Sequence, residues 1–246
     1  MQDINPLSIV SREFDEMTLM LAPCADPRTF PTADERKHAY IRWAVSYYVY
    51  AVIAHIRTVL HGLIALADSR NIPTATVVAR HLFEWAAHVC YITENLQTHI
   101  AAKDWDAARD LLDQAVIGNR WIKEHGHKYV PTDATTIPKT IRLNKVLASY
   151  EVHVETFLKG DARDDYAYLS EHSHPNSACL DQYVYREPGG QVRFAEPRRS
   201  SLQVVNSCVI DFTNLLLELL KLSDETVVRP KLGAILKEII DRHRKK

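Results

Sequence analysis

The side chains best suited to chemistry form two groups that lie far apart along the chain. The first group is His81, Glu84 and His88, whose spacings of three and four residues place them on one face of a predicted helix. A partly buried carboxylate beside imidazoles can act as a general base or bind a divalent metal ion. The alternative is a packed polar seam, in which Arg80 neutralises Glu84 from one helical turn away.

The second group lies where a helix must end. Ser170, His172 and His174 come shortly before Pro175, and the proline forces the chain into a turn. Turns and loops that a rigid scaffold positions often carry functional groups, and a serine hydroxyl can fix the tautomer of a nearby imidazole. A purely structural cap at the helix end is the alternative. The segment lacks G-x-S-x-G, so it is not the nucleophile elbow of a hydrolase.

A metal site could combine the two groups. Glu84, His88 and His174 would then be the ligands, and a metal-dependent hydrolase is one hypothesis for the function. The spacing of Glu84 and His88 is E-x3-H. Carboxylate-bridged di-iron bundles use E-x-x-H instead, so the spacing counts against a di-iron site.

The elements that must position these groups are helices. The capping box Thr32-Ala33-Asp34-Glu35 starts a helix of about 35 residues, because no proline follows before Pro73. Apolar steps of four and three define its expected core stripe, which is Ile41, Val45, Tyr48, Val52, His55, Val59, Gly62 and Leu66. Thr74 is expected to cap the next helix, which runs to about Asn95. Its core stripe is Val78, Leu82, Trp85, Val89, Ile92 and Leu96.

The remaining periodicity completes an all-α fold. Further helices are expected near 8–21, 101–125, 138–159, 161–170, 202–222 and 230–246. Residues 182–195 alternate around Gly189-Gly190, which predicts a β-hairpin. The sequence therefore predicts one helical domain over residues 1–246, with a bundle core at 33–223. The bundle has about seven or eight helices and one inserted hairpin.

The composition narrows the class of protein. The 246 residues are 46% hydrophobic and carry a net charge of -1, which excludes an overtly basic nucleic-acid binder. A local basic patch remains in the predicted helix 230–246. The four cysteines form no C-x-x-C pair, so reduced thiols are expected. With no signal peptide, and with an apolar stretch Trp43–Ala54 shorter than the roughly 18 residues of a membrane span, a cytoplasmic protein without a membrane partner is predicted.

Arg120 supplies a second candidate site. His125 and His127 follow it at the spacings Arg-x4-His and Arg-x6-His. This pattern resembles the motif of HEPN ribonucleases, which are metal-independent all-α enzymes. Trp121 stands where that family usually has a small polar residue.

Two segments together carry a further resemblance. Val78-Ala79-Arg80-His81-Leu82-Phe83-Glu84 and Tyr168-Leu169-Ser170-Glu171-His172-Ser173-His174-Pro175 resemble an uncharacterised bacterial all-α family, the domain of unknown function numbered 5677. The resemblance covers residues 35 to 220. It implies a shared pocket in which Arg80 and Glu84 face the turn of Ser170 and His174. Families of this helical type are similar to HEPN-like proteins of toxin and phage-defence systems.

Three functions follow as hypotheses. The first is a HEPN-like homodimer that acts on RNA in a toxin–antitoxin or defence system, as a metal-independent ribonuclease without a cofactor. Arg80 would bind a phosphate, and Glu84 would orient or deprotonate a reacting group. His172 or His174 would supply a proton, and Ser170 would be a further residue of the catalytic site. The second is the metal-dependent hydrolase. The third is a non-catalytic oligomeric binding subunit, whose seam would consist of aromatic residues of the long helix, namely Tyr40, Trp43, Tyr47 and Tyr50.

Overall fold

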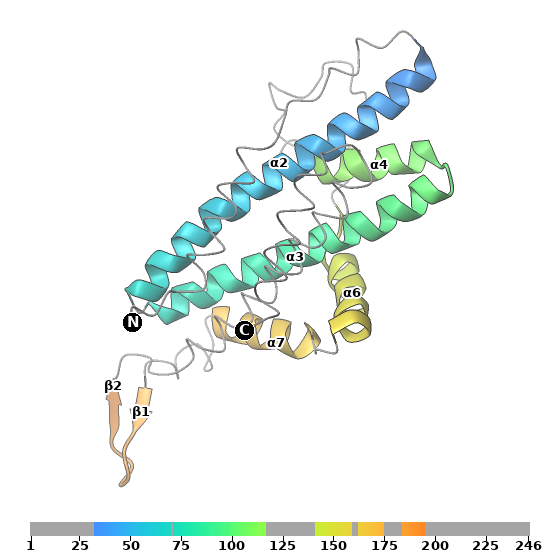
Figure 1. Cartoon of the computed structure of the whole chain (residues 1–246). Coiled ribbons are helices and arrows are strands. Elements are labelled where there is room, and N and C mark those ends of the chain that lie inside the picture. Colours follow the sequence, from blue (N-terminus) through green and yellow to red (C-terminus); the bar gives the residue numbers. More distant parts are fainter. Residues whose placement is uncertain (1–31, 70, 117–140, 159–161, 175–183, 195–246) are drawn as a thin grey trace, which may run out of the picture.

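A computed structural model describes residues 32–69, 71–116, 141–158, 162–174 and 184–194 (Figure 1). The α-helices in this part are α2 (Ala33–Asp68), α3 (Ile72–Ala101), α4 (Trp105–Val116), α6 (Leu143–His153) and α7 (Ala162–Ser173). The predicted all-α class is therefore confirmed for the described residues. The helices predicted at 8–21, 202–222 and 230–246 lie outside them, and so does Gly126, the predicted end of the helix 101–125.

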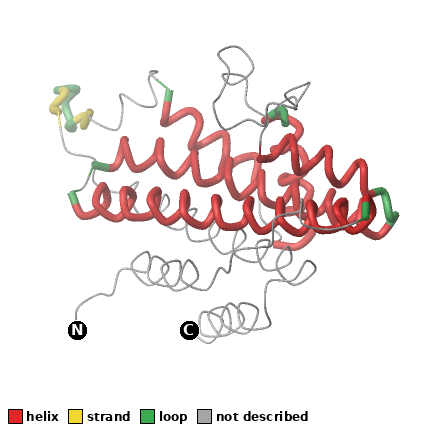
Figure 2. Tube along the Cα trace, turned by 90° about the horizontal axis from the view of Figure 1, so that it is seen from above, coloured by secondary structure: helices red, strands yellow, loops and turns green. Residues whose placement is uncertain are grey.

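Helix α3 lies at the centre of the bundle. It runs back along α2 after a short turn, and the view turned by 90° still shows two long helices side by side (Figures 1 and 2). Helix α4 packs against both α2 and α3, whereas α6 and α7 pack against α3. One helix thus contacts all four others, and its side chains must fit several neighbours at once.

Helix α2 begins with the predicted capping box. The backbone N–H of Glu35 donates to Thr32 Oγ1 at 3.1 Å, and the backbone N–H of Thr32 donates to Glu35 Oε2 at 3.1 Å. These reciprocal bonds satisfy amides that have no partner within the helix. The helix then continues to Asp68, so its predicted start and its length are confirmed.

The predicted core stripe of α2 is right in its first half and only partly right in its second, where Val59 and Leu66 are partly buried and pack against the core. The stripe residues from Ile41 to Val52 are buried, but His55 and Gly62 are exposed. The second half of the stripe instead consists of Ile53, Ile56, Leu60 and Leu63. The expected positions repeat every seven residues, whereas a straight α-helix drifts by about 20° per seven residues. After two such repeats the predicted stripe has therefore turned by about 40° away from the buried face, and His55 is exposed while Ile56 is buried.

Helix α3 starts before the expected cap and ends after the expected end. Asn71, not Thr74, is its N-cap, since Asn71 Oδ1 accepts the backbone N–H of Thr74 at 3.4 Å. Pro73 lies in the first turn, where a helix does not need its missing N–H. The helix extends to Ala101 instead of Asn95. The next helix starts at Trp105, after Lys103 adopts a φ of 56°.

The second half of the described chain holds two short helices and the hairpin. Helix α6 continues as a π-helical turn, η2 (Val154–Leu158), and α7 ends at Ser173, before Pro175. Strands β1 (Val184–Arg186) and β2 (Val192–Phe194) pair antiparallel, which confirms the predicted hairpin. Its turn depends on Gly189 and Gly190, whose φ angles of 111° and 82° disfavour residues with a Cβ.

Helix α2 is long and apolar enough, between Glu35 and Leu66, to cross a membrane by length and composition. This differs from the expectation based on Trp43–Ala54, because apolar residues continue on both sides of that stretch. Of its most apolar window, 33% is buried, and the helix packs against α3 and α4. Core helices of folded proteins pass the same test, so the location of the chain stays a prediction.

The shifted stripe predicts which substitutions in α2 destabilise the fold. Leu60→Ala removes a fully buried side chain and should lower the free energy of unfolding by about 3 kcal/mol. The adjacent His61→Ala changes an exposed side chain and should stay within about 0.5 kcal/mol of the parent. Urea denaturation followed by circular dichroism measures both. Equal losses for the two variants would contradict this placement of the stripe.

Candidate functional site

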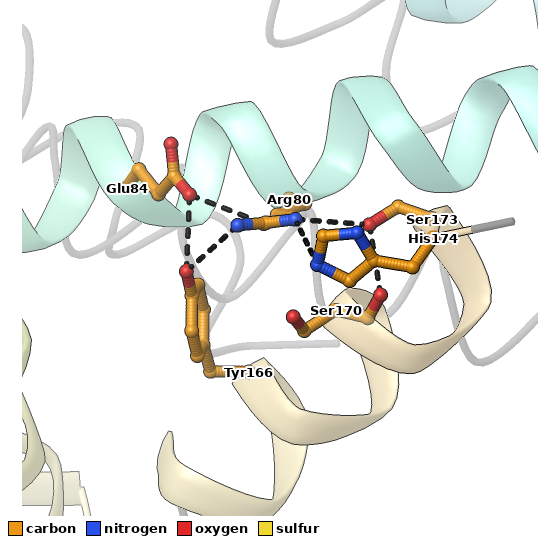
Figure 3. A network of polar contacts seen from close by, with 6 residues as sticks. All are labelled: Arg80, Glu84, Tyr166, Ser170, Ser173 and His174. Carbon is orange, nitrogen blue, oxygen red and sulfur yellow. Dashed lines mark hydrogen bonds and ion pairs between the residues drawn. The ribbon is translucent and has the colours of Figure 1, made fainter. Parts of the chain in front are cut away.

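The guanidinium of Arg80 lies at the centre of a polar cluster between α3 and α7 (Figure 3). Its Nε donates to Glu84 Oε1 at 3.1 Å, and one NH2 hydrogen goes to the hydroxyl of Tyr166 at 3.1 Å. The Tyr166 hydroxyl in turn donates to the same Glu84 oxygen at 3.1 Å. The three side chains therefore form a closed triangle, in which Tyr166 accepts from the cation and donates to the carboxylate.

The other side of the guanidinium faces the end of α7. Its NH1 lies 3.2 Å from Ser173 Oγ and 3.3 Å from His174 Nε2. Because a guanidinium can only donate, His174 Nε2 must present its lone pair, and the ring proton lies on Nδ1 while this bond is present. Ser173 Oγ also donates to the backbone carbonyl of Ser170 at 3.0 Å, which fixes its lone pairs toward Arg80.

The Arg80 cluster (Arg80, Glu84, Tyr166, Ser173 and His174) is half-buried. The side chains of Arg80 and Glu84 are 24% and 25% exposed. Burial by itself lowers the pKa of the Arg80 guanidinium, but the hydroxyl of Tyr166 and the carboxylate of Glu84 outweigh it, so the pKa is raised. The site therefore contains a permanent cation that solvent can reach.

The cluster keeps three polar groups that no described residue satisfies. Glu84 Oε2 points away from Arg80 and Tyr166 (Figure 3). The guanidinium has five N–H groups, and four of them are used within the cluster. His174 is exposed, and its Nδ1 has no partner among the described residues. A small polar or anionic group could therefore bind to one N–H of Arg80 and to the ring of His174 together.

The structure brings together three of the five residues predicted for the first site, namely Arg80, Glu84 and His174. Ser170 contributes its backbone carbonyl to Ser173 rather than its hydroxyl to the cluster. His172 instead bonds within its own helix, where its Nδ1 donates to the carbonyl of Tyr168 at 2.8 Å. The implied meeting of Glu84 and His174 takes place through Arg80, which contacts both.

Tyr166 is the residue of the cluster that the sequence prediction missed, whereas Ser173 lies in the segment before Pro175 that the prediction singled out. Tyr166, Ser170 and Ser173 are spaced by four and three residues, which places them on one face of α7. That spacing is a signal that could have found them. The sequence pattern of α7 does not show that this face packs against Arg80, which lies 86 residues before Tyr166 in the chain.

The metal-ligand set Glu84, His88 and His174 is not brought together, and this prediction needs correction. Glu84 faces α7, whereas His88 Nδ1 lies 2.8 Å from the hydroxyl of Tyr48 on α2. Likewise His81 Nε2 lies 2.9 Å from His55 Nε2 and accepts the Trp85 N–H at 3.1 Å. Side chains on one helix face thus diverge toward different helices. Among the described residues, the one group placed to hold a metal ion is Cys90, Glu94 and His153.

The second candidate site, Arg120 with His125 and His127, lies outside the described residues. This second site therefore stays a prediction.

No family model, curated protein or solved structure matches this chain. The resemblance to the domain of unknown function 5677 and to HEPN proteins therefore stays a prediction. The chemistry of the site has to be argued from its own geometry.

The burial of His88 predicts a pH dependence of stability. Burial lowers the pKa of His88 to about 4, whereas the unfolded chain binds this proton near 6.5. Between these values the unfolded state holds more protons, so stability is present above pH 6.5 and is lost as the pH falls toward 4. The loss from this one group should amount to about 3 kcal/mol.

Urea unfolding at several pH values measures this effect. His88→Gln should flatten the slope between pH 6.5 and pH 4, while His61→Gln, at an exposed position on α2, should leave the slope unchanged. The same slope in parent and His88→Gln would show that His88 is not held neutral by burial.

Proposed function

We propose that the Arg80 cluster is a metal-independent site that binds and cleaves a phosphodiester of RNA. The observation that carries the proposal is the contact between Arg80 NH1 and His174 Nε2 at 3.3 Å. It sets a permanent cation beside an imidazole lone pair at the protein surface. Cleavage of RNA needs a group that stabilises negative charge on the phosphate and a base for the 2′-hydroxyl, and this pair supplies both.

The proton transfers follow from the hydrogen bonds. When the phosphate binds Arg80, the bond between Arg80 NH1 and His174 Nε2 opens and frees the imidazole lone pair. His174 Nε2 then takes the proton of the 2′-hydroxyl, whose oxygen forms a bond to phosphorus. Arg80 donates to the phosphate oxygens as their negative charge grows. The bond from phosphorus to the 5′ oxygen breaks, and the imidazolium returns its proton to that oxygen. His174 thus first accepts a proton and then returns it, which differs from the role of proton donor predicted for His172 or His174 from the sequence.

Glu84 and Tyr166 position the guanidinium. Together they hold Nε and NH2, so that NH1 points at Ser173 and His174. The negative charge of Glu84 also offsets the positive charge of Arg80, so the site attracts anions only weakly. A substrate must therefore be held by further contacts outside the cluster. The predicted basic segment 230–246 would supply such contacts to an RNA backbone.

The proposal includes the biological setting that the resemblance implies. A HEPN-like helical protein of a toxin or phage-defence system would act in the cytoplasm, would need no cofactor and would function as a homodimer. Each of these statements depends on the RNA activity, which is therefore the property to measure first.

The test is cleavage of RNA by the purified full chain, with EDTA and with added Mg²⁺ or Mn²⁺ in parallel. We expect cleavage that survives EDTA and falls by about 10²- to 10³-fold in His174→Ala and in Arg80→Lys, because the base and the bidentate donor are lost. The matched controls are His61→Ala and Arg42→Lys, at exposed positions of α2. They should keep full activity.

Three results would overturn the proposal: no cleavage by the parent chain, cleavage that needs added metal, or full cleavage by His174→Ala. Thermal unfolding of each variant shows whether a loss of activity reflects the site or the fold. Glu84→Gln adds a second readout, since it should weaken the hold on Arg80 and reduce activity while His174 stays in place.

A second candidate function, the oligomeric binding subunit, is favoured by one observation on α2. Tyr47 and Tyr50 are 51% and 49% exposed, and the ring of Tyr47 stacks on Trp43 with 5.7 Å between centroids. Large exposed aromatic groups are typical of protein interfaces. Tyr40 is not available for the predicted seam, because its hydroxyl donates a hydrogen bond to Asp113 of α4.

This seam predicts a change of native mass. The parent chain should form a dimer in light scattering coupled to size-exclusion chromatography, and Tyr47→Glu with Tyr50→Glu should shift it to the monomer, because paired carboxylates would have to be buried. Lys103→Glu, exposed in the turn between α3 and α4, is the control. A parent chain that is monomeric at all concentrations would rule out the seam.

A further inference from the structure

A second cluster on α3 lies away from the Arg80 cluster and combines three side chains that bind metals. Cys90 and Glu94 lie one turn apart on α3, and His153 is the last residue of α6. Cys90 Sγ lies 3.7 Å from Glu94 Oε1, and His153 Nδ1 lies 2.9 Å from the same oxygen. The three ligand atoms all lie within 4.8 Å of one another.

These separations suit one small ion. In a tetrahedral zinc site, bond lengths of about 2.0 to 2.3 Å place neighbouring ligand atoms about 3.3 to 3.8 Å apart. The Cys90–Glu94 separation matches this already, and the His153–Glu94 separation needs to open by about 0.5 Å. Rotation of side chains suffices for such a change, because the two ligands lie on different helices.

The surroundings of the cluster support its geometry. Ser149 Oγ donates to Glu94 Oε2 at 3.1 Å, which leaves Oε1 directed at Cys90 and His153. Partners of this kind orient ligating carboxylates in metal sites. Cys90 is fully buried and His153 is 6% exposed, whereas the Glu94 side chain is 37% exposed. An ion could therefore enter past the carboxylate and meet the sulfur and the imidazole inside.

We propose that Cys90, Glu94 and His153 form a binding site for a divalent transition-metal ion of the zinc type. A thiolate and an imidazole select borderline-soft ions over Mg²⁺ or Ca²⁺, which require oxygen ligands. Three protein ligands leave the fourth tetrahedral position to water or a substrate, as in catalytic zinc sites. The proposal does not depend on the RNA activity of the Arg80 cluster.

Charge and protons balance in the bound state. Thiolate, carboxylate and neutral imidazole carry two negative charges, so a dication makes the buried site neutral, which removes much of the cost of burying charge. Binding releases the thiol proton of Cys90 to solvent. The proton on His153 Nδ1 must also move to Nε2, because a carboxylate only accepts and the present bond therefore uses Nδ1–H. Metal affinity should accordingly rise with pH, by about tenfold per unit while one proton is released.

The experiment uses the full chain after removal of metal with EDTA, titrated with Co²⁺ and then with Zn²⁺. We expect one Co²⁺ per chain, a near-ultraviolet charge-transfer band from a bond between sulfur and cobalt, and loss of that band when Zn²⁺ displaces the ion. Cys90→Ser should remove the band. His153→Gln should weaken binding at least tenfold, and Ser149→Ala should weaken it about tenfold through Glu94.

Matched controls separate this site from the other cysteines and histidines. Cys24→Ser, Cys179→Ser, Cys208→Ser and His61→Gln should bind Co²⁺ like the parent chain. No charge-transfer band in the parent, or a band that persists in Cys90→Ser, would overturn the proposal and leave Glu94, Ser149 and His153 as a hydrogen-bonded cluster only. If Cys90→Ser fails to fold by circular dichroism, His153→Gln decides the question. RNA cleavage is scored separately, since Arg80 and His174 are unchanged in every variant.

Discussion

The position of α3 is the constraint on which the rest of the structure depends. Four other helices pack around it, so its polar side chains lose water and must find partners on those helices. Glu84 and Arg80 find them on α7, His88 on α2, and Glu94 on α6. An unpaired polar group would cost the fold about 1 to 3 kcal/mol if it were fully buried, and less where it is partly exposed, as Arg80, Glu84 and Glu94 are. The polar clusters are therefore the way in which a mostly apolar central helix accommodates its few polar side chains. The chemistry of each cluster follows from the partners that its side chains find.

A line of aromatic rings connects the two clusters through the core. Phe83 lies 5.4 Å from the ring of Tyr166 and 5.1 Å from that of Tyr150, and Tyr150 stacks near His153 at 6.2 Å. These rings fill the space between α3, α6 and α7. A shift of α6 on metal binding would thus reach the helix that carries Tyr166, Ser173 and His174, because close-packed interiors transmit displacement.

Local patterns predicted the elements better than their contacts. The capping box at Thr32, the hairpin at Gly189 and the end of a helix before Pro175 depend on neighbours in sequence, and the structure has them. Helix α7 ends at Ser173 and not near Ser170, so Ser170 and His172 lie within the helix and not in a turn. The predicted core stripe of α2 is wrong at His55 and Gly62 for a geometric reason, the mismatch between 3.6 and 3.5 residues per turn. The contact between Glu94 and His153, 59 residues apart, depends on how α6 packs on α3. No periodicity within either helix contains that information.

The two carboxylates of α3, Glu84 and Glu94, differ in their charged partners, and this difference explains why Glu94 and not Glu84 is suited to bind a metal ion. Glu84 shares one oxygen with the guanidinium of Arg80, whose charge would repel a metal ion at that site. Glu94 has no ion pair with lysine or arginine in the described part of the chain, and its charged-group contact is the imidazole of His153. A carboxylate that no lysine or arginine of the described residues neutralises, beside a thiol and an imidazole, is suited to attract a mobile cation. The same helix therefore presents one site suited to anions and one suited to metals, and the difference between them is a single arginine.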